Sequence, residues 1–142
     1  MASLGRPEIS HNFQFGFDPA TKILLVRVEG RFTDESGREL YKAIRKYSVA
    51  TNAPAGILDL SSVIEFALSD EFIHRWARGE PAMPDAMRRS RIIVVPDTFG
   101  YGLARIFGLL SEPTNPLLQI VHTIDKAFSA LGVQSPHFEP LE

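Results

Sequence analysis

Three short apolar segments, separated by stretches long enough for a helix, constrain what this chain can fold into. They span residues 56–60, 91–95 and 118–122, and they consist mainly of Ile, Leu and Val. Such nearly continuous apolar runs are typical of strands that are buried on both faces of a sheet. Because parallel strands need long crossover connections, which are usually helices, these segments predict the inner parallel strands of one α/β sheet.

The N-terminal part of the chain predicts a β-hairpin. Residues 12–17 alternate polar and aromatic side chains, and residues 22–30, beyond the turn at 18–21, are rich in Ile, Leu and Val. Side chains repeat every second residue in a strand, so Phe13, Phe15 and Phe17 should share the face that covers the core. The hairpin would add an antiparallel edge to the sheet.

Helices are predicted between and after the strands. Thr33 or Asp34 can cap the first helix, Ser69 the second, and Thr123 or Asp125 the last, while a third helix should run from about 98 to 111. The predicted order is ββαβαβαβα, which is a single α/β domain with a mixed sheet, mainly parallel inner strands and helices packed against it. In the first helix the apolar residues recur at helical spacing: Leu40, Tyr41, Ile44 and Tyr47.

The length and composition fit one domain and exclude several classes of function. We expect the domain to span residues 12–133, with a flexible N-terminal arm at 1–11 and a C-terminal tail at 134–142. The net charge of −2 argues against a nucleic acid partner. With no cysteine and four dispersed histidines, a metal site is not expected, and no cofactor is predicted. No apolar run is long enough for integral membrane contact, so a cytoplasmic location is expected.

Two stretches carry a resemblance to a known family. Residues 57–63 read Ile-Leu-Asp-Leu-Ser-Ser-Val, and residues 118–122 lead into an Asp-Lys-Ala-Phe-Ser-Ala-Leu segment at 125–131. In this order of elements, residues 22–133 resemble the STAS domains of bacterial anti-sigma-factor antagonists, described as SpoIIAA-like. The resemblance implies a non-enzymatic regulatory or protein-interaction module, and no catalytic residues are expected.

The resemblance also assigns a role to one serine. In phosphorylated members of the family, a serine at the start of the second helix is modified by a partner kinase and controls partner binding, and Ser69 corresponds to it. Chemistry offers an alternative, because a serine in this position can cap the helix by accepting a free backbone N–H. Asp70 and Glu71, which follow it, favour a cap because they would oppose a dianionic phosphate.

A second candidate is the end of the strand at 56–60. Open α/β sheets bind ligands near the carboxyl ends of their strands, so Asp59, Ser61 and Ser62 could form a loop that contacts a ligand or partner. Alternatively, Asp59 accepts backbone N–H groups from the next loop and stabilises the crossover.

The third predicted helix could provide an interface. Gly100, Ala104 and Gly108 recur every four residues, and Tyr101 and Leu109 remain as large apolar groups outside the core face. This pattern suggests a contact with a partner protein or a homodimer. The alternative is a helix covered by residues 112–116 and the tail.

Two further hypotheses stay open. Arg75, Arg78, Arg88, Arg89 and Arg91 could meet and dock an anionic ligand, although such runs are usually solvated. The ten phenylalanines could instead line an apolar cavity of a small-molecule or lipid carrier, because SpoIIAA-like proteins also resemble lipid-binding CRAL-TRIO domains in topology.

Overall fold

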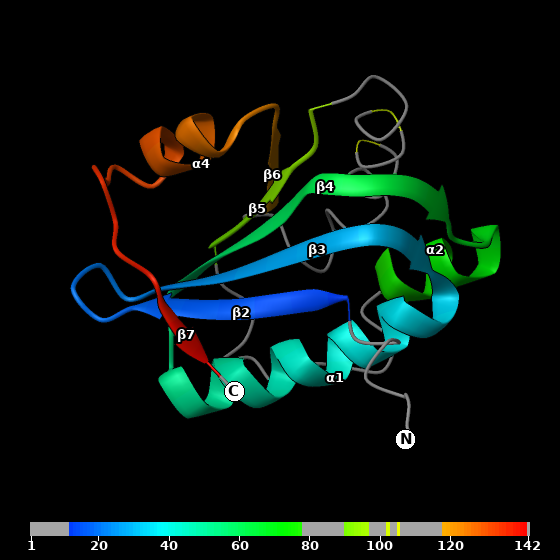
Figure 1. The fold of residues 1–142 in the computed structure, drawn as a ribbon, viewed down its shortest axis with the longest axis horizontal. Coiled ribbons are helices and arrows are strands. Elements are labelled where there is room, and N and C mark those ends of the chain that lie inside the picture. Colours follow the sequence, from blue (N-terminus) through cyan, green and yellow to red (C-terminus); the bar gives the residue numbers. More distant parts are fainter. Residues whose placement is uncertain (1–11, 78–89, 97–101, 103–104, 106–117, 142) are drawn as a thin grey trace.

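The computed structural model describes residues 12–77, 90–96, 102, 105 and 118–141. The elements, in chain order, are β2 (Phe13–Asp18), β3 (Ile23–Thr33), α1 (Asp34–Thr51), β4 (Ala55–Ala67), α2 (Asp70–Ala77), β5 (Ser90–Val94), β6 (Leu118–Val121), α4 (Ile124–Ala130) and β7 (Glu139–Leu141). Within these residues, six strands form one sheet in the order β6-β5-β4-β3-β2-β7 (Figure 1).

The three apolar segments lie side by side, as predicted. Strands β4, β5 and β6 are adjacent and parallel, with Leu58 opposite Ile93 and Ile93 opposite Ile120. Strand β3 is also parallel to β4, whereas β2 runs antiparallel to β3. The mixed sheet with parallel inner strands is therefore confirmed.

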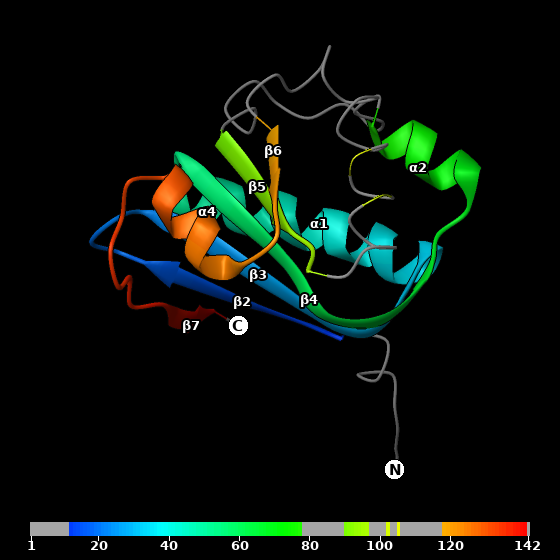
Figure 2. The same ribbon diagram turned by 90° about the horizontal axis from the view of Figure 1, so that it is seen from above.

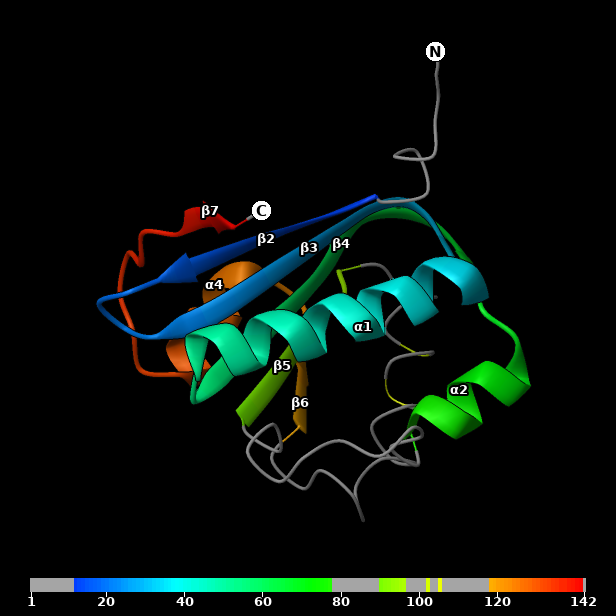
Figure 3. The same ribbon diagram turned by 90° about the horizontal axis from the view of Figure 1, so that it is seen from below.

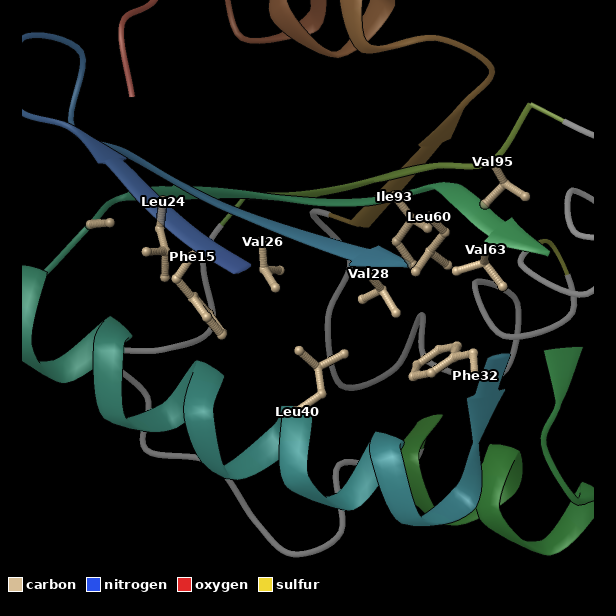
Figure 4. Close-up of a cluster of buried hydrophobic side chains, with 11 residues drawn as sticks. Phe15, Leu24, Val26, Val28, Phe32, Leu40, Leu60, Val63, Ile93 and Val95 are labelled. Atoms are coloured by element: carbon tan, nitrogen blue, oxygen red, sulfur yellow. The ribbon is translucent and has the colours of Figure 1, made fainter. Parts of the chain in front are cut away.

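Each face of the sheet is covered by a helix. Helix α1 packs on one face, and α4 packs on the other (Figures 1 and 2). Figure 4 shows Leu40 reaching from α1 toward strand side chains, and Leu40 is completely buried. Alternation along β3 divides its residues between the faces, so that Val26 and Val28 lie in the α1 cluster, and Ile23 and Leu25 lie in the α4 cluster.

The predicted hairpin is confirmed. Phe15 is buried in the α1 cluster, and Phe13 and Phe17 pack against it from the same face of β2. Burial of Asp18 acts to raise the pKa of its carboxyl, but hydrogen bonds from the backbone of Ala20, the hydroxyl of Thr21 and the backbone of His137 hold that pKa below its ordinary value. The turn is thus fixed by a charged acceptor.

The C-terminal tail predicted at 134–142 contains one strand, β7, which the sequence did not predict. β7 pairs antiparallel with β2, which places β7 rather than the hairpin at this edge of the sheet. The ring of Phe138 stacks on that of Phe128 at 6.2 Å. Pro140 weakens the strand pattern in the sequence, but an edge strand tolerates a proline because one side of it needs no N–H donor.

Both ends of α1 match the sequence signals. The side chain of Thr33 accepts a hydrogen bond from the backbone N–H of Ser36, and the side chain of Ser36 accepts one from the backbone N–H of Thr33. The two bonds form a capping box. The helix ends at Asn52, which has a left-handed φ of 52° and donates its N–H to the carbonyl of Ser48. Ala53 and then Pro54 follow, and a proline disfavours a helical conformation for the residue before it.

Two predicted segments lie largely or wholly outside the described residues. The N-terminal arm at 1–11 is not described. Of the predicted helix at 98–111, only Gly102 and Arg105 are described, and both are helical.

Candidate functional site

The predicted loop after Asp59 does not exist, because β4 continues to Ala67. Ser61 and Ser62 are exposed strand residues. The register between β3 and β4 shifts twice, and each shift gives β4 an extra residue, as in a β-bulge. Figure 2 shows the second half of β4 curving toward α2. The sequence prediction failed here because β3 is also longer than expected and pairs with this extension through Thr33.

Asp59 is buried and makes two hydrogen bonds within the sheet. It is only 2% exposed, and one of its carboxylate oxygens accepts the backbone N–H of Ser61 at 3.0 Å. The other accepts the guanidinium Nε–H of Arg27 at 3.1 Å. The predicted hydrogen bond from a following backbone N–H to Asp59 is therefore present, but its donor, Ser61, lies in the same strand and not in a loop. The ion pair with Arg27 was missed, since it depends on the register between two strands.

Ser69 joins the beginnings of two helices. Its hydroxyl oxygen accepts the N–H of Phe72 at 3.1 Å, which is the geometry of a helix cap for α2. The same hydroxyl donates to Asp34 at 2.7 Å, and the backbone N–H of Ser69 donates to the other carboxylate oxygen at 2.8 Å. Asp34 opens α1, so one carboxylate links the N-termini of α1 and α2. Figure 3 shows the beginnings of these two helices near each other.

A groove of about 620 Å³ lies beside this link, between α1 and α2. Its lining combines basic side chains, aromatic rings and the linked pair. The described lining residues are Asp34, Arg38, Tyr41, Lys42, Arg45, Ser69, Glu71, Phe72, Arg75 and Trp76.

The electrostatics of the groove differ from those of the whole chain. Among the described residues, the lining has four basic side chains against two carboxylates, whereas the net charge of the chain is −2. Both carboxylates are engaged, because Asp34 binds Ser69 and Glu71 lies 3.7 Å from Arg75. The lining is therefore a local region of positive potential.

Aromatic side chains form the apolar part of the lining. The rings of Phe72 and Trp76 are 5.3 Å apart, and Trp76 also contacts Phe32 from the core at 6.4 Å. The ring of Phe72 lies over Gly37 of α1, where a Cβ atom would be only 2.5 Å from it. Burial raises the pKa of Tyr41, and the charge of Arg45 opposes part of that increase.

The sequence alone carried a partial signal for this groove. Arg38, Lys42 and Arg45 follow an i, i+4, i+7 pattern, which places them on one face of α1. A basic helix face is ordinarily solvated, and only the position of α2 shows that this one borders a groove.

Comparisons with known proteins identify the fold. The solved structure of an anti-sigma factor antagonist from Mycobacterium paratuberculosis matches with a TM-score of 0.53 and 23% identity, over 83% of this chain and 92% of that chain. The chain has the STAS fold. No family model matches the sequence, and no curated protein matches it.

Ser69 directly precedes α2, which begins at Asp70. A phosphate on this hydroxyl would have to replace its hydrogen bond to Asp34 and would stand beside that carboxylate as well as Asp70 and Glu71. Like charges at such distances repel. The geometry therefore favours the capping role over the phosphoacceptor role.

The remaining predicted site residues do not gather at the groove or lie outside the described residues. The interface residues of the third helix, Gly100, Tyr101, Ala104, Gly108 and Leu109, lie outside the described residues, so the homodimer stays a prediction.

The predicted arginine cluster is not assembled by the described part of the chain. Arg75 lines the groove, but Arg91 lies near the start of β5, opposite Gly56 and far along β4 from α2. Arg78, Arg88 and Arg89 lie outside the described residues.

The described residues also bear on two other kinds of site. No group of three His, Asp or Glu side chains there is arranged to hold a metal ion. Among the helices that could be described, none is both long and apolar enough to cross a membrane.

Proposed function

We propose that this chain is a cytoplasmic, non-enzymatic regulatory module of the STAS type that acts by binding a protein partner. The observation that carries the proposal is the groove between α1 and α2, next to the Asp34–Ser69 link. It brings basic and aromatic side chains to one surface, and arginine and aromatic residues are enriched in protein interfaces. The solved structure with this fold is itself an anti-sigma factor antagonist.

The carrier hypothesis lacks comparable support. A carrier would need its phenylalanines to line an apolar cavity. Instead, Phe15 and Phe32 are buried in the α1 cluster, and Phe13, Phe17 and Phe66 pack against it. Phe72 lines the groove, but the same lining has four basic side chains. The fold similarity adds nothing in favour of an apolar ligand.

Affinity capture from an extract of the source organism tests the proposal. The groove variant combines Arg38→Glu with Arg45→Glu, and both arginines are exposed, so the fold should tolerate the changes. The control variant combines Lys46→Glu with Lys126→Glu, which changes the net charge equally at exposed positions outside the groove.

The proposal predicts that one protein is captured by the wild type and the control and is lost from the groove variant. Capture that is equal for all three chains would contradict the role of the groove. If the wild type captures nothing at micromolar concentration, the interaction module itself is rejected.

A further inference from the structure

We propose that the groove binds an extended acidic segment of the partner that also inserts one aromatic or aliphatic side chain. This inference rests on the proposed function and specifies the chemistry of the partner. Three features of the groove support it: the spacing of its cations, the engagement of its carboxylates and the position of its aromatic rings.

The spacing of the basic side chains on α1 matches an extended peptide better than a single small anion. Arg38 and Arg45 are seven residues apart on α1, and Lys42 lies between them on the same face. At a rise of about 1.5 Å per residue, this stripe extends about 10 Å along the helix. An extended peptide covers about 10 Å in three residues. A segment with repeated carboxylates can therefore contact the whole stripe, whereas one carboxylate or phosphate contacts only part of it.

Among the described residues, few carboxylates compensate the positive charge of the stripe. Lys42 lies 3.8 Å from Glu39, which is a marginal ion pair between residues of one helix turn. Within the described residues, no carboxylate lies within ion-pair distance of Arg38 or Arg45. Of the two carboxylates in the described lining, Glu71 lies 3.7 Å from Arg75, whereas Asp34 accepts hydrogen bonds from Ser69 and keeps its charge. Along Arg38, Lys42 and Arg45 an acidic ligand would thus find charge complementarity, and its carboxylates would avoid the charge of Asp34.

The aromatic rings account for the apolar side chain in the proposal. Tyr41, Phe72 and Trp76 line the same groove as the cations. Trp76 and Phe72 are only partly buried, so their rings still have area to cover. Central aromatic pockets surrounded by polar groups are where binding energy concentrates in protein interfaces. A peptide that is purely acidic would leave this area uncovered.

The sequence contains one tryptophan, Trp76, so intrinsic fluorescence reports directly on the groove. The probes are three synthetic ten-residue peptides: one with glutamates around a central leucine, one with lysines around that leucine, and one with glutamates around a central glycine. Inorganic phosphate is the fourth probe. The leucine is chosen because it adds no fluorescence of its own.

The glutamate–leucine peptide should change the Trp76 emission saturably, and added salt should weaken the binding. The groove variant Arg38→Glu/Arg45→Glu should bind about tenfold more weakly, because two ion pairs become repulsive contacts. The Lys46→Glu/Lys126→Glu control should bind like the wild type. The lysine peptide should not bind, and the glycine peptide should bind more weakly than the leucine peptide.

Equal binding of the lysine peptide, or unchanged binding by the groove variant, would overturn the inference. Displacement of the peptide by inorganic phosphate at equal concentration would also overturn the inference, because the groove would then be a site for any small anion. If the acidic peptide fails to bind while partner capture still depends on the groove, this inference falls and the proposed function stands.

Discussion

Asp34 and Ser69 are linked by two hydrogen bonds that both end on the carboxylate of Asp34, at 2.7 Å from the hydroxyl and 2.8 Å from the backbone N–H. The two residues are 35 positions apart, with a whole helix and a long strand between them. The link fixes the start of α2 against the start of α1 and so fixes one end of the groove. It also means that a negative charge already occupies the space beside the Ser69 hydroxyl.

A charge at position 69 should therefore be coupled to Asp34. Asn and Asp cap helices equally well, so Ser69→Asn and Ser69→Asp form an isosteric pair that differs in charge. The free energy of unfolding should differ between the Ser69→Asn and Ser69→Asp variants. When Asp34 is also replaced by Asn, this difference should shift by about 1 kcal/mol in favour of the Ser69→Asp variant. Urea unfolding of the four variants at low salt measures this coupling. A coupling near zero would show that the carboxylate does not oppose an anion at this site.

The two ion pairs between β3 and β4 should differ in their contribution to stability. Asp59 is buried, so Arg27→Met would leave its carboxylate buried without its partner, at a cost of about 2 kcal/mol. Arg31 and Glu65 form an equally short pair, but both are more than half exposed, so Arg31→Met should cost less than about 0.5 kcal/mol. Denaturant unfolding of both variants compares them directly. Equal losses would contradict a buried role for Asp59.

Gly37 should be required by the ring of Phe72 rather than by the helix. Replacing a helical glycine by alanine ordinarily stabilises a protein by about 1 kcal/mol. The new Cβ atom would lie 2.5 Å from Phe72, so the ring would have to move, and the gain should disappear. In a Phe72→Ala background, Gly37→Ala should recover the gain of about 1 kcal/mol. Thermal unfolding compares Gly37 with Gly37→Ala in the wild-type chain and in the Phe72→Ala variant. An equal change in stability in both backgrounds would contradict the contact between position 37 and the ring of Phe72.

The attachment of β7 should depend on the ionisation of Asp18. Burial favours the protonated form, but the hydrogen bonds from Ala20, Thr21 and His137 outweigh it, so the pKa is lowered from 3.8. A lowered pKa means that the ionised carboxylate stabilises the folded state at neutral pH, and that this contribution is lost as the pH falls through the folded pKa. The backbone amide signal of His137 should therefore titrate with a midpoint below 3.8. A midpoint above that value would contradict the assignment.

The sequence predicted the strands and helices that have strong local signals. Continuous apolar residues indicated the three inner strands, and Thr33 indicated the start of α1. These signals are local, so they do not depend on what packs nearby. β7 was missed for the converse reason, because its three residues have no periodicity and are ordered by pairing with β2 and by the carboxylate of Asp18.

The candidate site was less predictable because it consists of contacts between distant segments. Ser69 was identified as a possible cap, but its partner Asp34 could not be, since nothing local relates the two. The loop predicted at Ser61 and Ser62 failed because the length of β4 is set by its pairing with β3. The basic face of α1 was visible as a pattern, but it borders a groove only because α2 lies beside it.

The most direct test of the groove as the binding surface is a map of amide chemical shifts. The isotopically labelled chain would be titrated with the partner recovered by affinity capture. The account predicts that the largest changes fall on residues 34–45 of α1 and 69–77 of α2, and that Lys126 and its neighbours on α4 stay unchanged. Changes concentrated on α4 or β7, with α1 and α2 unaffected, would contradict it.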